Sequence, residues 1–397
     1  MEITRVKCLV PFYVMQFCTY GFVRTCCPSW TKVGPIGNLY IDKDIMSIWN
    51  SPRAQKIRRA VLEGRLEDVC NVGFCPFAVA KSEIDLATFH VDDSRMQRVI
   101  EQIRLGKTEL ATGPVDINLS DSGDCNLKCK MCRANDAFYA RDPRITDLLF
   151  NQVLPAILPA ASRITLTGNG DPFFRKDTRD FMQSPVLKEN YPDLKLQIIT
   201  NGMLLNEKMW QTVKHNMFAW INISVDGASR KTYEYIRKGG KWEILRSNLD
   251  FISKVRQSGQ IAALNLNFLV LKSNYREILD FARWALELRC DTVVFQKVSG
   301  LLDVRENIYF TKDMDALKTI GILLTDPIFD EKCFNIAEIQ FCKNHATHRV
   351  TVLDRLRTRL FIMFFSLPAY FFYAVRYRFA PVYFKVYKIF RRIGIIS

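Results

Sequence analysis

Six short apolar runs alternate with longer helical segments through the middle of the chain, and this alternation limits the possible fold more than any other feature. Each run is long enough for one buried strand, and each intervening segment can form a helix that returns the chain to begin a parallel strand. Closed barrels of this kind have eight strands, so six predict an α/β fold with a partial barrel. The strand-like runs are 115–120, 163–167, 194–199, 220–225, 262–270 and 291–298, and the helical segments lie near 144–158, 177–190, 205–216, 241–258 and 274–288.

Polar residues follow each predicted strand at the point where the strand ends. In barrels of parallel strands these ends share one face, and active sites are built on that face. We therefore expect the polar groups to lie together. They are the loop 124–133 after the first strand, Gly168-Asn169-Gly170-Asp171-Pro172 after the second, Thr200-Asn201-Gly202 after the third, Ser224-Val225-Asp226-Gly227 after the fourth, Lys272-Ser273-Asn274 after the fifth and Gln296-Lys297 at the end of the sixth.

Three cysteines, Cys125, Cys129 and Cys132, lie in the loop after the first predicted strand, with three and then two residues between them. Three thiolates from one loop can hold three irons of a four-iron, four-sulfur cluster and leave the fourth iron without a protein ligand. A small molecule with an amine and a carboxylate could bind that open iron. The alternative is a zinc or structural cluster site that takes its fourth ligand from a cysteine elsewhere in the chain.

The spacing of these cysteines resembles the signature of the radical S-adenosylmethionine (radical SAM) enzymes, whose fold is a TIM-like partial (β/α)6 barrel. The resemblance implies that the three cysteines are catalytic and hold a 4Fe-4S cluster whose open iron binds SAM. One electron, from a donor such as flavodoxin or ferredoxin, would allow SAM to be cleaved to a 5′-deoxyadenosyl radical that removes a hydrogen atom from the substrate. Met131 stands where the family commonly has an aromatic residue, on the adenine side of the pocket.

The resemblance also assigns SAM contacts. The segment 168–172 resembles the family's Gly-Gly-Glu-Pro segment, in which backbone carbonyls and an acid receive the methionine ammonium, and its glycines permit close approach of the backbone. Arg237 is a candidate partner for the SAM carboxylate because its planar fork matches that group, although it could equally be a solvated cation at a helix end. The expected SAM-binding residues are Gly168, Asn169, Gly170, Asp171, Asn201, Ser224, Asp226 and Arg237.

Four further cysteines, Cys8, Cys26, Cys70 and Cys75, lie in the first 85 residues, where a capped helix is predicted over 52–62. These thiolates alone would also suit a zinc site. The pattern Cys-x12-Gly-x4-Cys and Cys-x4-Cys, with an Ile-Trp-Asn-Ser helix start, resembles the SPASM/twitch modules of radical SAM enzymes, although the module here precedes the barrel. The resemblance implies one auxiliary 4Fe-4S cluster, which could accept an electron from a substrate radical, bind substrate or stiffen the domain.

Charge and composition indicate location and partners. The grouped cysteines favour metal ligation over disulfides and predict a cytoplasmic protein, and the uncharged run 8–23 lacks the cleavage site of a signal peptide. The tail 349–397 carries +9 of the net charge of +15, so the remainder is too mildly basic to indicate nucleic acid binding. Within the tail, 360–375 is uncharged but short for a membrane span. We expect this tail to lie on the inner face of an anionic membrane; the alternative is that it covers the barrel.

These features together predict a radical SAM oxidoreductase or related modifying enzyme. We expect the substrate to be a carbohydrate or lipid-linked glycan, because of the tail, with a peptide as the alternative. The hypothesis from another class is a non-catalytic zinc or iron–sulfur protein whose tail binds membrane or nucleic acid. The expected divisions are an auxiliary-cluster domain at 1–85, a helix and linker at 86–112 with the helix centred on 94–104, the barrel at 113–300, an extension at 301–348 and the basic aromatic tail at 349–397.

Overall fold

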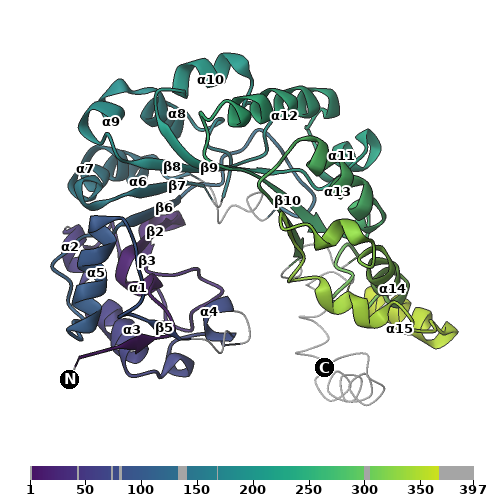
Figure 1. Cartoon of the computed structure of the whole chain (residues 1–397), viewed down its shortest axis with the longest axis horizontal. Coiled ribbons are helices and arrows are strands. Elements are labelled where there is room, and N and C mark those ends of the chain that lie inside the picture. Colours follow the sequence, from purple (N-terminus) through teal and green to yellow (C-terminus); the bar gives the residue numbers. More distant parts are fainter. Residues whose placement is uncertain are drawn as a thin grey trace, which may run out of the picture. The chain divides into compact units, whose positions relative to one another are not determined.

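The structure is a computed structural model that describes residues 2–42, 44–72, 75–79, 83–132, 141–167, 169–298 and 305–365. The chain divides into two compact units. Figure 1 labels most of the helices and strands along the chain. The first unit comprises Met1–Asn126, Arg133–Ile223 and Ser247–Leu264, and the second comprises Leu127–Cys132, Ser224–Arg246 and Asn265–Ser397.

A mixed sheet forms the centre of the first unit. The first five strands, in the spatial order given below, each run parallel to the next. The last two strands each run antiparallel to the strand before them. Apolar side chains such as Ile117, Leu119, Ile198 and Ile221 are completely buried, as expected for parallel strands that helices cover. In spatial order the strands are β9 (Met217–Ser224), β8 (Lys195–Thr200), β7 (Arg163–Leu166), β6 (Asp116–Ser120), β2 (Val14–Cys18), β3 (Phe22–Arg24) and β4 (Gly37–Asn38).

Helices connect these strands and build the cysteine-rich N-terminal part. The connecting helices are α6 (Pro143–Leu148), a π-helical turn (Leu149–Val153), α7 (Leu154–Ile157), α8 (Lys176–Gln183), α9 (Pro185–Asn190) and α10 (Glu207–Val213), and α12 (Trp242–Gln257) begins in the second unit. The N-terminal part contains α1 (Val10–Tyr13), α2 (Ile45–Trp49), α3 (Pro52–Leu62), α4 (Pro76–Val79), α5 (Ser94–Arg104) and the small antiparallel pair β1 (Arg5–Val6) and β5 (Ile84–Asp85).

Side chains of the Ile-Trp-Asn-Ser segment, residues 48–51, form hydrogen bonds with the linker that follows α5. The side chains of Trp49 and Asn50 donate hydrogen bonds to backbone oxygens in the linker, at 2.9 Å in both cases. Ser51 caps α3 by accepting from Ala54 N, which confirms the predicted cap. Arg58 of α3 is completely buried, lies over the Trp49 ring at 4.3 Å and donates to two further backbone oxygens. The motif therefore holds the chain that leads into β6.

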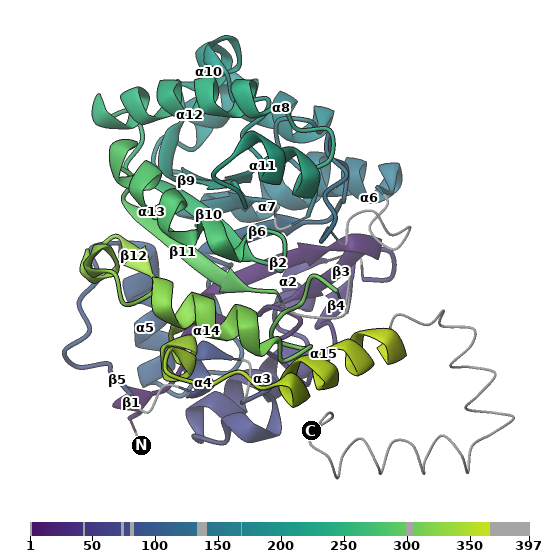
Figure 2. The same ribbon diagram turned by 90° about the vertical axis from the view of Figure 1, so that its right-hand side faces the viewer.

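The second unit is built on three parallel strands, β10 (Leu264–Val270), β11 (Thr292–Lys297) and β12 (Phe334–Asn335). Aromatic rings from β10, α13 (Ile278–Glu287) and β11 fill its core, with ring centroids of Phe268 and Phe281 4.8 Å apart. The other helices are α11 (Arg230–Ile236), α14 (Met314–Leu323) and α15 (Val352–Phe365). Arg355 of α15 forms an ion pair with Asp315 of α14, at 2.9 Å, and the two helices lie side by side (Figure 2).

The predicted fold class is confirmed: strands and helices alternate in an α/β fold of the partial-barrel type, after a cysteine-rich N-terminal part. The six predicted strands are β6 to β11, and their bounds lie within three residues of the expected ones. Several features were not predicted, including the following two. Helix α11 was missed, and β2 pairs with β6 over its whole length, from Val14 with Asp116 to Cys18 with Ser120, so the N-terminal part continues the sheet of the first unit.

Where the structure describes the chain, no helix is long and apolar enough to cross a membrane. Helix α15 contains the start of the uncharged run 360–375. The rest of the tail, 366–397, lies outside the described residues, and so does the greater part of the segment expected at a membrane surface.

Candidate functional site

The three-cysteine loop after β6 is shared between the two units. Cys125 belongs to the first unit, whereas Cys129 and Cys132 belong to the second. Cys129 is buried, and the other two thiols are partly exposed.

In the first unit, the turn after β7 is hydrogen-bonded to the beginning of the cysteine loop. Asp171 N donates to Asp124 O at 2.9 Å, and Asn169 Nδ2 donates to Ser120 O at 3.0 Å. Gly170 has a φ of +70°, and a Cβ atom there would lie 2.4 Å from Asp124 O. Only glycine allows this approach, which brings the expected SAM-binding residue Gly170 beside the residue that precedes Cys125. Gly168, also expected to bind SAM, lies outside the described residues.

We predict that Gly170→Ala destabilises the protein much more than Gly259→Ala. Both glycines have positive φ, so each substitution costs about 1–2 kcal/mol of stability, but only at Gly170 would the new methyl group collide with backbone. The collision adds about 1–3 kcal/mol. Denaturant midpoints of the metal-free proteins measure the difference, and equal losses for the two variants would show that the contact between the two loops is dispensable.

The carboxylate of Asp171 lies in the interior, which differs from the expected contact with an ammonium group. Its side chain is completely buried, with Oδ1 accepting from Phe173 N at 3.0 Å and Oδ2 accepting from Thr200 Oγ1 at 2.7 Å and Asn201 N at 2.9 Å. Burial raises the pKa of Asp171, and these hydrogen bonds oppose the rise. Asp171 therefore joins the ends of β7 and β8. A turn sequence shows that an acid is present but not which way its side chain points.

Asn201, at the end of β8, lies beside the first cysteine of the loop. Its Nδ2 donates to Asn126 Oδ1 at 2.8 Å and lies 3.5 Å from Cys125 Sγ, while its Oδ1 accepts from Met203 N at 3.0 Å. The structure thus places this expected SAM-binding residue at the cysteine loop itself. Of the predicted set in the first unit, Gly170, the backbone of Asp171 and Asn201 are brought to the loop, and Asn169 bonds with the last residue of β6.

In the second unit, Arg237 and Asp226 form a buried pair beside Cys129. Arg237 Nη2 donates to Asp226 Oδ2 at 2.5 Å, and Nη1 lies 3.9 Å from Cys129 Sγ. Burial alone would lower the pKa of Arg237, but the charges of Asp226 and Cys129 outweigh it and raise the pKa above its usual range. The structure therefore excludes the solvated-cation alternative for Arg237. Ser224, also expected to bind SAM, is the partly exposed last residue of β9.

A small apolar hollow lies next to the same stretch of the cysteine loop. One group at this hollow, Ser273 Oγ, is buried and has no hydrogen-bond partner within the described ranges. Most of the residues that line the hollow were not predicted from the sequence. Leu271 and Val298 could have been identified, because they directly follow β10 and β11. The lining residues are Lys130, Met131, Ile236, Leu271, Ser273, Val298 and Glu306.

The four N-terminal cysteines line one cavity, together with apolar residues of α3 and α4. Burial raises the pKa of Cys8 to about 12 and that of Cys70 to about 11, so these thiols would have to lose protons to bind metal. A single zinc ion needs four sulfurs about 2.3 Å from it. Cys8, Cys26, Cys70 and Cys75 therefore face one cavity, as the ligands of a shared zinc or iron–sulfur site would.

Comparison with protein families gives two matches. The profile described as "Radical SAM superfamily" matches residues 119–285, and the profile described as "Iron-sulfur cluster-binding domain", SPASM, matches residues 8–76. The first match contains the three-cysteine loop, and the second contains the four cysteines that line the N-terminal cavity.

Curated relatives are similar to the chain over part of its length. GTP 3′,8-cyclase from Synechocystis is 26% identical over 183 residues, which are 44% of this chain and 52% of the relative. GTP 3′,8-cyclase from Nautilia profundicola is 28% identical over 174 residues, which are 43% of this chain and 52% of the relative. The chain spans about half the length of the curated relatives it matches.

Solved structures are similar at the level of the fold. SuiB from Streptococcus suis with S-adenosylmethionine bound is 15% identical, with a TM-score of 0.45, over 79% of this chain and 72% of SuiB. SuiB has also been solved with its precursor peptide SuiA. A structure of anSMEcpe with AdoMet and a peptide bound is 15% identical, with a TM-score of 0.41, over 54% of this chain and 61% of anSMEcpe.

Proposed function

Because the chain belongs to the radical SAM superfamily and carries a SPASM domain ahead of its barrel, we propose that it abstracts a hydrogen atom from its substrate and oxidises or rearranges it. Its cofactors are a catalytic 4Fe-4S cluster with SAM and auxiliary iron–sulfur in the SPASM domain. When bound and reduced, the catalytic cluster and SAM supply a 5′-deoxyadenosyl radical. The single observation that carries the proposal is the glycine-dependent contact between the cysteine loop and the turn at residues 169–171.

The residues of this chain would hold and orient the cofactors. Cys125, Cys129 and Cys132 would ligate the catalytic cluster, and the backbone at 169–170 would receive the ammonium group of SAM close to it. The apolar hollow beside Met131 suits a planar base, and the unpartnered hydroxyl of Ser273 could bond with a polar edge atom. We propose this hollow for the adenine of SAM. One auxiliary 4Fe-4S cluster would occupy the cavity of the SPASM domain.

Of the two substrate classes we propose a peptide first and a carbohydrate or lipid-linked glycan second. Two of the compared structures hold a peptide. The glycan hypothesis depended on the tail, and residues 366–397 lie outside the described residues. Contact of the tail with a membrane likewise stays a prediction. A one-electron donor such as flavodoxin or ferredoxin is the partner that the reaction requires.

The test is anaerobic reconstitution with iron and sulfide, followed by dithionite and SAM. We expect 5′-deoxyadenosine to form, and its absence from protein with both clusters loaded would instead favour the non-catalytic iron–sulfur hypothesis. Deuterated candidate substrates then decide the substrate class, because abstraction transfers deuterium into 5′-deoxyadenosine. Transfer from a peptide supports the first class, and transfer from a glycan alone replaces it with the second.

A further inference from the structure

The segment 235–240 is hydrogen-bonded to the cysteine loop on both sides of Cys129. Lys128 N donates to Lys238 O, and Lys130 N donates to Ile236 O, both at 2.9 Å. Because these two hydrogen bonds flank Cys129 on the loop and Arg237 on the segment, the two residues face each other. All of these residues belong to the second unit.

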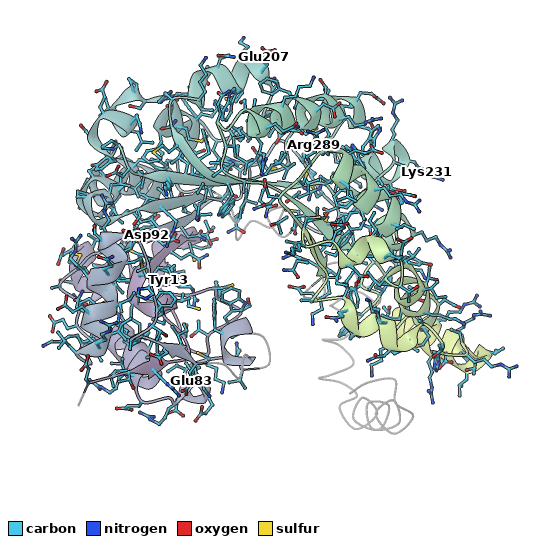
Figure 3. All side chains as sticks on the ribbon, viewed as in Figure 1. Tyr13, Glu83, Asp92, Glu207, Lys231 and Arg289 are labelled. Atoms are coloured by element: carbon cyan, nitrogen blue, oxygen red, sulfur yellow. The ribbon has the colours of Figure 1, made fainter. Side chains whose placement is uncertain are left out.

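Helix α11 presents this segment to the loop. The helix buries Tyr233 and Ile236, and its Lys231 points outward (Figure 3). The chain leaves the helix through two glycines, and at Gly240 a Cβ atom would lie 2.7 Å from the hydroxyl of Tyr233 and 2.9 Å from Arg237 O. The segment that carries Arg237 is therefore tightly packed, and its backbone position is fixed by the helix and by the loop.

The guanidinium of Arg237 is held in place by Asp226. Asp226 Oδ2 accepts from Arg237 Nη2, and its Oδ1 accepts from Leu269 N at 2.7 Å. Asp226 has a φ of +62°, a strained backbone conformation that the hydrogen bond from Asn274 Nδ2 to Asp226 O, at 3.0 Å, helps to maintain. Strain of this kind persists only where the surroundings fix it, so the aspartate is a rigid support for the arginine.

This geometry directs the arginine to a ligand of the catalytic cluster. One terminal nitrogen is bonded to Asp226, the other lies 3.9 Å from Cys129 Sγ, and the Arg237 side chain is only 10% exposed. Hydrogen bonds to cluster sulfurs and nearby charge set the reduction potentials of iron–sulfur clusters. A buried cation at a sulfur favours the reduced cluster, which carries one more negative charge than the oxidised one.

We propose that Arg237 is a positioning residue that raises the reduction potential of the catalytic cluster by donating to the sulfur of Cys129 from a position fixed by Asp226. The inference rests on the proposed function, since it needs the cluster at Cys129. This role replaces the expectation that Arg237 binds the carboxylate of SAM. A higher reduction potential makes one-electron reduction of the cluster by the donor protein easier.

Redox titration of the cluster-loaded protein without SAM, followed by EPR, tests the proposal with Arg237→Gln, Arg237→Lys and the control Lys238→Gln. Lys238 is exposed and adjacent, so the control removes the same charge without touching the sulfur. The signal that changes when SAM is added identifies the catalytic cluster. We expect its midpoint to shift to a more negative potential in Arg237→Gln, to shift less in Arg237→Lys and to stay unchanged in the control.

The affinity for SAM is measured on the same samples. Unchanged midpoints together with weaker SAM binding would overturn the proposal and restore the carboxylate role. If Arg237→Gln takes up no catalytic cluster, the midpoint potential and the SAM affinity of Arg237→Lys decide between the two roles. Failure of the proposed function is a separate result, because it would appear as wild-type protein that holds both clusters and forms no 5′-deoxyadenosine.

Discussion

Replacement of any one of Cys125, Cys129 and Cys132 by alanine is expected to abolish 5′-deoxyadenosine formation while about half of the bound iron remains, because one of two four-iron clusters would be lost. Each substitution removes one of three ligands supplied by a single loop. The auxiliary cluster would stay, because its four cysteines line a separate cavity in the first unit. Iron and sulfide analysis, with product measured by chromatography, checks both parts of the prediction.

The matched control is Cys333→Ala. Cys333 is a partly exposed cysteine that precedes β12 and lies far along the chain from both cysteine groups. The control should keep all the iron and the full rate of SAM cleavage. Complete loss of iron from the loop variants would show that the two groups of cysteines are not independent sites, and a fall in iron in the control would support the hypothesis of a fourth ligand from elsewhere in the chain.

The alternation of strands and helices could be predicted from the sequence because each strand is a short apolar run between clear helices. Helix α11 was missed because its seven residues carry only a few apolar positions, too few to show helical periodicity. Strand β2 alternates, but its parallel pairing with β6 joins residues about 100 positions apart. Nothing local to either segment shows that pairing, so the continuation of the sheet into the N-terminal part could not be predicted.

The candidate site, like the fold, could be predicted from the sequence only in part. Its residue types and their place after the strands could be predicted, because the ends of parallel strands share one face. The partners of the charged groups could not. Asp171 and Arg237 carry charges suited to SAM, yet Asp171 bonds with Thr200 and the backbone, and Arg237 bonds with Asp226 beside Cys129. Burial decides these partners, since a charge enclosed in the protein must be paired where it lies.

The metal content of the SPASM domain is the subject of the second prediction with a large expected effect. Cys26→Ser is expected to remove the iron of the auxiliary cluster, because Cys26 lines the cavity with the other three cysteines. SAM cleavage in the absence of substrate should continue, since the catalytic loop keeps its three cysteines. Conversion of substrate to product should be lost if the auxiliary cluster accepts an electron or binds substrate, and kept if it only stiffens the domain.

Cys27→Ser is the control for this prediction, because Cys27 is the next residue but does not line the cavity. Its Sγ lies 3.1 Å from Ser29 Oγ, and the contact is exposed. A ligand set defined by position in space predicts that only Cys26→Ser loses iron, whereas a loose group of thiols around one ion would tolerate either substitution. Equal iron in the two variants, or zinc in place of iron in the wild type, would contradict the auxiliary cluster. The adjacent pair thus tests whether the cavity, rather than the spacing of cysteines along the chain, selects the ligands.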